Sequence, residues 1–303
     1  MEDILKRIPY SERGIPAVVA EPYLKVSDEF LQLEGLCFDR EDNLVFCDVF
    51  QGGIYRVKKG TKDVERILSL PGKNPSAVKL GPDGRLYIAC LGDFKSTGSL
   101  LAYDPDTQKL DQIIGPEEGF VIDDLCFRSD GSFYFSNFIG GGTNRVGGIY
   151  HAGPRGKIIR PVCRNLAVPN GLVLTPDERG LWITEMGASQ LHFLELLDDG
   201  VSIADYGDLI PYRFSGLNGP DSCSVDSEGN LYVAMYQQGR VLIFSPQGVP
   251  VEQVLLPGSW NGEFLRSTHP KIVPGTDQLL ICSNDYTNGK GAAIFSAKAL
   301  ARG

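Results

Sequence analysis

The chain has 303 residues, and its 29 Lys and Arg against 38 Asp and Glu give a formal net charge of −9. This balance argues against a nucleic-acid partner, which needs a basic face. No apolar run approaches the ~20 residues that span a bilayer, so we expect no membrane partner. Residues 1–7 lack the apolar core of a secretory signal, and the seven cysteines show no C-x-x-C spacing. We therefore expect reduced thiols and a cytoplasmic location.

One phrase recurs along the chain: a turn rich in Asp and Gly, followed by a short β-prone run. The runs open at Leu44, Leu86, Phe133, Leu181, Leu231 and Leu279. Their successive spacings are 42, 47, 48, 50 and 48 residues. No stretch shows a sustained helical period. Six units of three or four strands predict an all-β fold, a six-bladed β-propeller that takes residues 1–303 as one domain.

The last unit nearly exhausts the chain, so it is expected to lack its outer strand. An N-terminal segment within about residues 1–30 would then close the ring, and the apolar run 16–20 is the candidate strand. Such a closure leaves no open sheet edge.

The repeat also selects one polar position per unit. Counting back ten residues from each opening residue, or eleven in the fourth unit, reaches Glu34, Ser76, Asp123, Asn170, Asp221 and His269. Each precedes an apolar run that would be the innermost strand of its blade. Equivalent positions on six radial blades meet at one mouth of the central channel, so these side chains are expected to converge.

Several carboxylates crowded together favour a bound cation. Carboxylate and amide oxygens are ligands for a hard divalent ion, so the pattern predicts one cation, Ca²⁺ first, with Mg²⁺, Mn²⁺ or Zn²⁺ as alternatives. The competing interpretation is that these residues merely cap turns at the starts of the inner strands.

Long phrases of the sequence resemble the SMP-30/gluconolactonase/LRE-like family of six-bladed propellers, and a subgroup of Ca²⁺-dependent lactonases within it. The resemblance runs nearly end to end and includes the phrases at residues 31–36, 91–98, 122–124, 219–223, 231–236 and 266–270. It implies that Glu34, Asn170, Asp221 and Ser222 are metal ligands. It also implies that Asp123 is an acidic residue near the metal. A proline before Asn170 departs from that subgroup.

The resemblance implies hydrolysis of a small-molecule lactone by metal-activated water, with an Asp as general base. Asp123 and Asp221 are the catalytic candidates, and Asp123 is the better base because a metal-ligating Asp is a weak one. His269, Ser76 and Asp93 are weaker candidates for substrate binding. Two alternatives stay open: another hydrolase, such as a phosphotriesterase, using the same site, or a non-catalytic propeller with a structural calcium. The oligomeric state is open as well.

Overall fold

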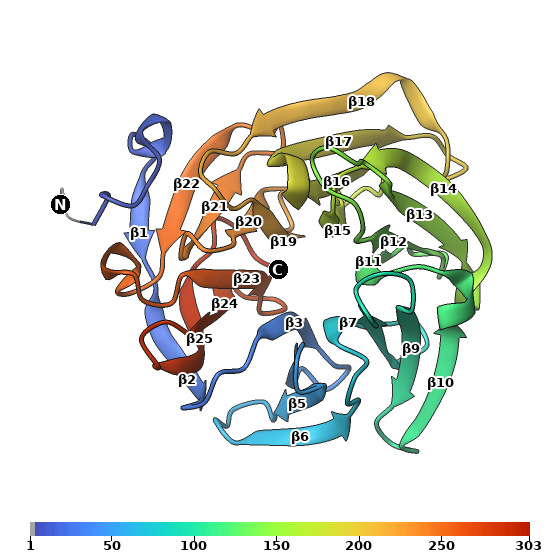
Figure 1. Cartoon of the computed structure of the whole chain (residues 1–303), viewed down its shortest axis with the longest axis horizontal. Helices are drawn as coiled ribbons and strands as arrows, with labels where there is room; N and C mark the ends of the chain where they lie inside the picture. Colours follow the sequence, from blue (N-terminus) through green and yellow to red (C-terminus); the bar gives the residue numbers. More distant parts are fainter. Residues whose placement is uncertain (1–3) are drawn as a thin grey trace.

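The computed structural model describes residues 4–303 and forms a ring of six antiparallel sheets around a central axis (Figure 1). The sheets are the blades of a six-bladed β-propeller, as the repeat predicts. Residues 1–3, which belong both to the expected closing segment and to the stretch 1–7 considered for a secretory signal, lie outside the described residues.

The first three blades follow one another along the chain, each with its strands in order from the axis outward. Blade one consists of β3 (Leu33–Phe38), β4 (Leu44–Asp48), β5 (Gly53–Val57) and β6 (Val64–Ser69). Blade two consists of β7 (Pro75–Leu80), β8 (Leu86–Cys90), β9 (Ser99–Asp104) and β10 (Lys109–Ile114). Blade three consists of β11 (Ile122–Phe127), β12 (Phe133–Asn137), β13 (Gly147–Gly153) and β14 (Lys157–Leu166).

The other three blades complete the ring, and two of them take a strand from the N-terminal part of the chain. Blade four consists of β15 (Pro169–Leu174), β16 (Gly180–Glu185), β17 (Gln190–Leu196) and β18 (Ile203–Arg213). Blade five consists of β19 (Pro220–Val225), β20 (Leu231–Met235), β21 (Arg240–Phe244), β22 (Pro250–Leu255) and β1 (Ala17–Val19). Blade six consists of β23 (Arg266–Ile272), β24 (Gln278–Asp285), β25 (Gly291–Lys298) and β2 (Glu21–Ser27).

The helical content of the described chain consists of single 3-10 turns, namely η1 (Tyr10–Glu12), η2 (Pro116–Glu118), η3 (Pro154–Gly156), η4 (Met186–Ala188) and η5 (Ser259–Asn261). Within residues 4–303 no helix has the length and apolar character needed to cross a membrane.

An N-terminal strand closes the ring, as expected, but it is not the predicted segment 16–20. The outer strand of blade six is β2, which pairs antiparallel with β25, with Leu24 opposite Ile294. The predicted run instead supplies β1, which pairs parallel with β22 and adds a fifth strand to blade five. The difference has a physical reason: Leu24 is buried between blades six and one, whereas Val18 on β1 stays 40% exposed.

The core lies between the blades rather than inside one central mass. Six apolar clusters each join two neighbouring sheets, so every blade packs against the next around the ring. Phe46 of blade one and Ile294 of blade six, for example, are fully buried in the same cluster. Burying such a side chain contributes roughly 1.5–3 kcal/mol. The ring is therefore held by six similar interfaces.

The Asp- and Gly-rich turns form the hairpins between the first and second strands of each blade, as their sequence indicates. Gly84 and Gly131 adopt φ values of 80° and 84°, a left-handed conformation that favours glycine. Blades one and four place Asp42 and Glu178 at this kind of position, at 59° and 58°.

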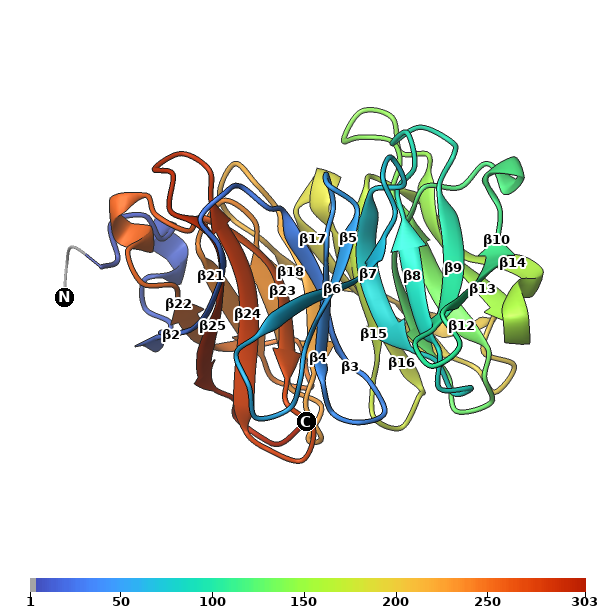
Figure 2. The same ribbon diagram turned by 90° about the horizontal axis from the view of Figure 1, so that it is seen from below.

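The strand directions define two different faces of the ring, and Figure 2 shows the strands running between them. All six inner strands begin at one face, here called the starting face. Because neighbouring strands are antiparallel, every second strand ends there too. The inner strands end at the opposite face.

Candidate functional site

The polar register predicted from the repeat lies at the starting face, around the channel. Glu34, Ser76, Asp123, Asn170 and Asp221 are each the second residue of an inner strand. All five are buried. The structure thus places one of these residues at the same position of the inner strand on each of five successive blades.

A break in strand pairing accompanies this register in every blade. The pairing of each inner strand with its neighbour shifts at the site, as between Glu34 and Cys37 in β3 and between Ile122 and Leu125 in β11. Shifts of this type bend the strand and redirect a side chain. They free Glu34 and Asp123 from the regular alternation of the sheet.

Glycine allows the blades to approach closely beside the acidic residues. A Cβ added to Gly35 would lie 2.6 Å from the backbone nitrogen of Val78 in blade two. One added to Gly171 would lie 2.7 Å from Ser222 Cα in blade five. The side chains of neighbouring blades are brought together because these two positions lack one.

The sixth member of the predicted register is wrong by one residue. Leu279 pairs with Ile272, four residues after Thr268, just as Leu44 pairs with Phe38, four residues after Glu34. The equivalent position in blade six is therefore Thr268 and not His269. The hairpin of blade six is one residue longer than the prediction assumed, as it is in blade four.

Hydroxyl groups fix the backbone of the site across blade boundaries. The Ser76 hydroxyl donates to the main-chain oxygen of Asp123 at 2.8 Å. Thr184 donates to that of Asp221 at 2.6 Å, and Thr268 to that of Leu33 at 2.7 Å. These bonds give Ser76 a positioning role, whereas its predicted contact with substrate stays a prediction.

The pKa values of the three carboxyl groups are raised, mainly by burial. Burial, then the charges of Asp221 and Asp123, raises the pKa of Glu34 well above its ordinary value. Burial, then the charges of Asp221 and Asp124, does the same for Asp123. Burial raises the pKa of Asp221 to about 8, against hydrogen bonds from Asn170 and the backbone of Ser222. Such a group cannot hold all its negative charges without a positive partner.

The donors around these carboxylates suit a hard divalent cation. Asn170 and Ser222 lie beside them, and the Ser222 hydroxyl is 3.4 Å from the Asn170 amide oxygen. Within residues 4–303 no three His, Cys, Asp or Glu side chains form a group that could hold a metal by themselves. The candidate set therefore includes the oxygens of Asn170 and Ser222 as well as carboxylates. Its all-oxygen chemistry fits Ca²⁺.

His269 lies next to the register rather than within it. Its Nδ1 is 3.8 Å from Glu34 Oε2, and the residue is fully buried. Burial, then the charges of Lys79 and Lys271, lowers its pKa well below the ordinary value, so the ring is neutral.

Asp93 lies on the starting face and, unlike the three carboxylates, is exposed. It is exposed in the loop after β8, where its Oδ1 accepts hydrogen bonds from the backbone amides of Lys95, Ser96 and Thr97. These bonds lower its pKa. They make it a loop cap, and a substrate contact by Asp93 stays a prediction.

The site has two features that the sequence did not reveal. Val168 precedes the strand of Asn170 with a φ of 51°, a strained value for a β-branched residue. Its amide donates to Ile139 and its carbonyl accepts from Met186. On the same face, Phe30 packs edge-on against Tyr286 at 4.9 Å, with Phe50 at 6.2 Å. Only the packing of the loops brings these aromatic residues together.

Residues 33–263, which contain every residue of the candidate metal site, match the sequence family described as the SMP-30/gluconolactonase/LRE-like region. The chain belongs to this family. Family relatives include the lactonase drp35 of Staphylococcus saprophyticus, which is 50% identical over 100% of this chain and 94% of its own length. The lactonase drp35 of Staphylococcus aureus strain USA300 is 46% identical over 97% of this chain and 91% of its own.

The family fold also appears in solved structures with low sequence identity. The calcium-binding protein regucalcin from Agrobacterium tumefaciens superimposes with a TM-score of 0.73 at 18% identity, over 95% of this chain and 97% of its own. This likeness supports the six-bladed architecture.

Proposed function

We propose that this protein is a Ca²⁺-dependent lactonase whose reaction takes place at the starting face, with Asp123 as general base. The observation that carries the proposal is the convergence of Glu34, Asp123 and Asp221, three buried carboxyl groups of which Asp221 raises the pKa of both others. Such perturbed groups are typical of a functional site.

The class of reaction rests on the relatives. Proteins named lactonase are 46–50% identical to this chain over 97–100% of its length. The chain is accordingly a hydrolase of cyclic esters, and the substrate is a small-molecule lactone. The exposed faces of Phe50 and Tyr286 offer an apolar wall on the starting face for the carbon skeleton of such a substrate.

We assign the cation to Glu34, Asn170, Asp221 and Ser222. Their oxygens are buried together, and the cation would balance charges that the apo carboxylates cannot hold. A bound divalent cation supplies Lewis-acid polarisation of a lactone carbonyl.

Asp123 is assigned the proton transfer. Burial and the neighbouring charges of Asp221 and Asp124 raise the pKa of its carboxyl group, which makes it a stronger base than an ordinary Asp. Ser76 holds the Asp123 backbone from the next blade. Asp123 would accept a proton from water as the water oxygen bonds to the carbonyl carbon. The bond to the ring oxygen would then break, and that oxygen would take the proton from Asp123 and leave as an alcohol.

The test compares Asp123→Asn with Asp221→Asn on a panel of lactones, with Ca²⁺ affinity measured separately by calorimetry. We expect Asp123→Asn to lower kcat by about 10²–10⁴-fold while Ca²⁺ affinity changes little. Asp221→Asn should lower both kcat and Ca²⁺ affinity. The exposed Asp63→Asn is the matched control and should behave as the unmodified protein.

Three results would contradict the proposal. Normal lactone hydrolysis by both variants would remove the site assignment. Full activity in EDTA would remove the cation requirement. A higher kcat/KM on phosphotriesters than on any lactone would place the enzyme in a different class of hydrolase.

A further inference from the structure

The central channel contains a second polar layer, deeper than the carboxylates. A cavity of about 300 Å³ is lined by residues of all six inner strands. These residues follow the acidic register along each strand, so the cavity lies toward the opposite face. One residue per blade, three positions after the register, lines it: Cys37, Lys79, Cys126, Val173, Ser224 and Lys271.

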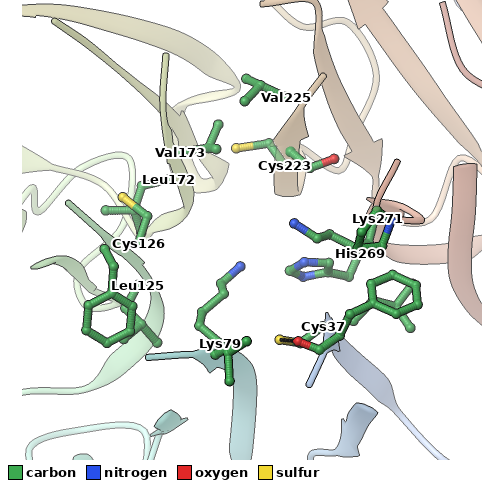
Figure 3. A pocket seen from close by; sticks show the side chains of 16 residues that line it. Cys37, Lys79, Leu125, Cys126, Leu172, Val173, Cys223, Val225, His269 and Lys271 are labelled. Carbon is green, nitrogen blue, oxygen red and sulfur yellow. Dashed lines mark hydrogen bonds between the residues drawn. The ribbon is translucent and has the colours of Figure 1, made fainter. Parts of the chain in front are cut away.

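Two lysines reach into this cavity from different strands. Figure 3 shows the side chains of Lys79, from β7, and Lys271, from β23, extending toward its middle. Lys79 Nζ lies 3.0 Å from Oδ1 of the fully buried Asp124. Among residues 4–303 no carboxylate lies within ion-pair distance of Lys271. The cavity thus holds two lysine amino groups and one carboxylate, and burial, then the charge of Lys79, lowers the pKa of Lys271.

His269 provides an independent indication of a ligand. The residue is fully buried and lines the cavity; its Nδ1 lies 3.8 Å from Glu34 Oε2, and its Nε2 has no hydrogen-bond partner. A buried polar group without a partner is costly. A neutral imidazole always carries one N–H donor, which can serve an anionic oxygen.

The rest of the wall is mostly apolar. Leu36, Leu125, Leu172 and Val225 surround the lysines, together with the thiols of Cys37, Cys126 and Cys223. A singly charged anionic head group on an apolar body matches this lining, because its negative charge would favour the ammonium form of the unpaired Lys271. A free phosphate, with more charge and no apolar part, matches it less well.

We propose that this cavity binds the carboxylate of a small organic acid, with the carboxylate held by Lys271 and Lys79 and its apolar body against the leucines. His269 donates to the same head group. This site lies deeper in the channel than the proposed reaction site. Ligand binding to it can be measured with metal-free protein, in which no lactone is hydrolysed.

Calorimetric titration of EDTA-treated protein with benzoate tests the proposal. We expect benzoate to bind, and benzyl alcohol and inorganic phosphate to bind at least tenfold more weakly. Lys271→Met should weaken benzoate binding at least tenfold. The exposed Lys298→Met is the matched control and should bind benzoate as the unmodified protein does.

The proposal is overturned if benzoate does not bind, or if Lys271→Met binds benzoate as tightly as the unmodified protein does. If phosphate binds more tightly than benzoate, the ligand is not a carboxylate. Lys271→Met removes an amino group that has no ion-pair partner, so its melting temperature should not fall. Crystals of the unmodified protein soaked in 4-bromobenzoate test the site without a variant, because the bromine can be located by its anomalous scattering. A bromine peak between Lys79 and Lys271 supports the site, whereas a peak only beside Asp221, or none, contradicts it.

Discussion

The same position serves different purposes in different blades because its neighbours differ. Ser76 and Asp123 are both the second residue of an inner strand. The Ser76 hydroxyl is bonded to the backbone of the next blade, whereas the Asp123 carboxyl group faces the charges of Asp221 and Asp124. At this scale the propeller supplies a fixed location, and the side chain with its immediate partners decides the chemistry.

The raised pKa of Asp221 predicts a pH dependence of stability in the metal-free protein. The pKa of the Asp221 carboxyl group is about 4 in the unfolded chain and about 8 in the folded protein. At a pH between these two values, the folded state holds a proton that the unfolded state has lost. This group therefore makes stability fall as pH rises through that window. Urea denaturation of EDTA-treated protein at pH 5, 6.5 and 8 measures the effect.

The comparison with Asp221→Asn isolates this one group. The variant lacks the carboxyl group, so its stability should decline less between pH 5 and pH 8. A steeper decline in the variant than in the unmodified protein would show that Asp221 is not held as a buried acid.

The sequence predicted most of the acidic register but not the lysine layer. Glu34, Asp123, Asn170 and Asp221 were found because each stands before an apolar run at a constant distance from a recognisable turn. His269 was assigned in place of Thr268 because hairpin length varies by one residue, which the spacing alone cannot reveal. Lys79 and Lys271 are isolated charges within strands, and only the stacking of blades brings them together.

At the scale of elements, the ring is closed by the N-terminal segment that buries an apolar side chain in the interface between blades six and one. The sequence predicted an N-terminal closing strand correctly, since the last unit was short. It could not distinguish the run 16–20 from β2, because both are β-prone. In the structure Leu24 on β2 packs into the cluster between blades six and one, whereas β1 adds to the edge of blade five.

With β2 as the closing strand, we expect two similar side-chain substitutions to change the free energy of unfolding by different amounts. Leu24→Ala should lower the free energy of unfolding by about 2–4 kcal/mol, because it leaves a cavity in a blade interface. Val18→Ala on the half-exposed β1 should change it by roughly 0.5 kcal/mol or less. Chemical denaturation compares them, and an equal or larger loss for Val18→Ala would restore the run 16–20 as the closing strand.

At the scale of the whole molecule, the proposed cation joins blades one, four and five across the axis, through Glu34, Asn170, Asp221 and Ser222. A ligand that binds only the folded state stabilises that state by about 2.7 kcal/mol when its free concentration is 100 times Kd. Adding Ca²⁺ at that level to EDTA-treated protein should raise the melting temperature by roughly 5 °C.

The control for this prediction is again Asp221→Asn, which should show a smaller rise at the same Ca²⁺ concentration. Magnesium at equal concentration tests the choice of ion. If Ca²⁺ leaves the melting temperature of the unmodified protein unchanged, the four residues do not act as a cation site linking the blades.

The three-residue offset between the carboxylates and the lysines gives the ring an electrical polarity. Three residues of strand span about 10 Å, so opposite charges stand at two depths of one narrow channel. Low-dielectric walls strengthen the field that such charges produce. The proposed cation would therefore bind nearer the starting face and the proposed carboxylate ligand nearer the other. Six strands of equivalent geometry would in this way hold two ligands of opposite charge at two depths of one channel.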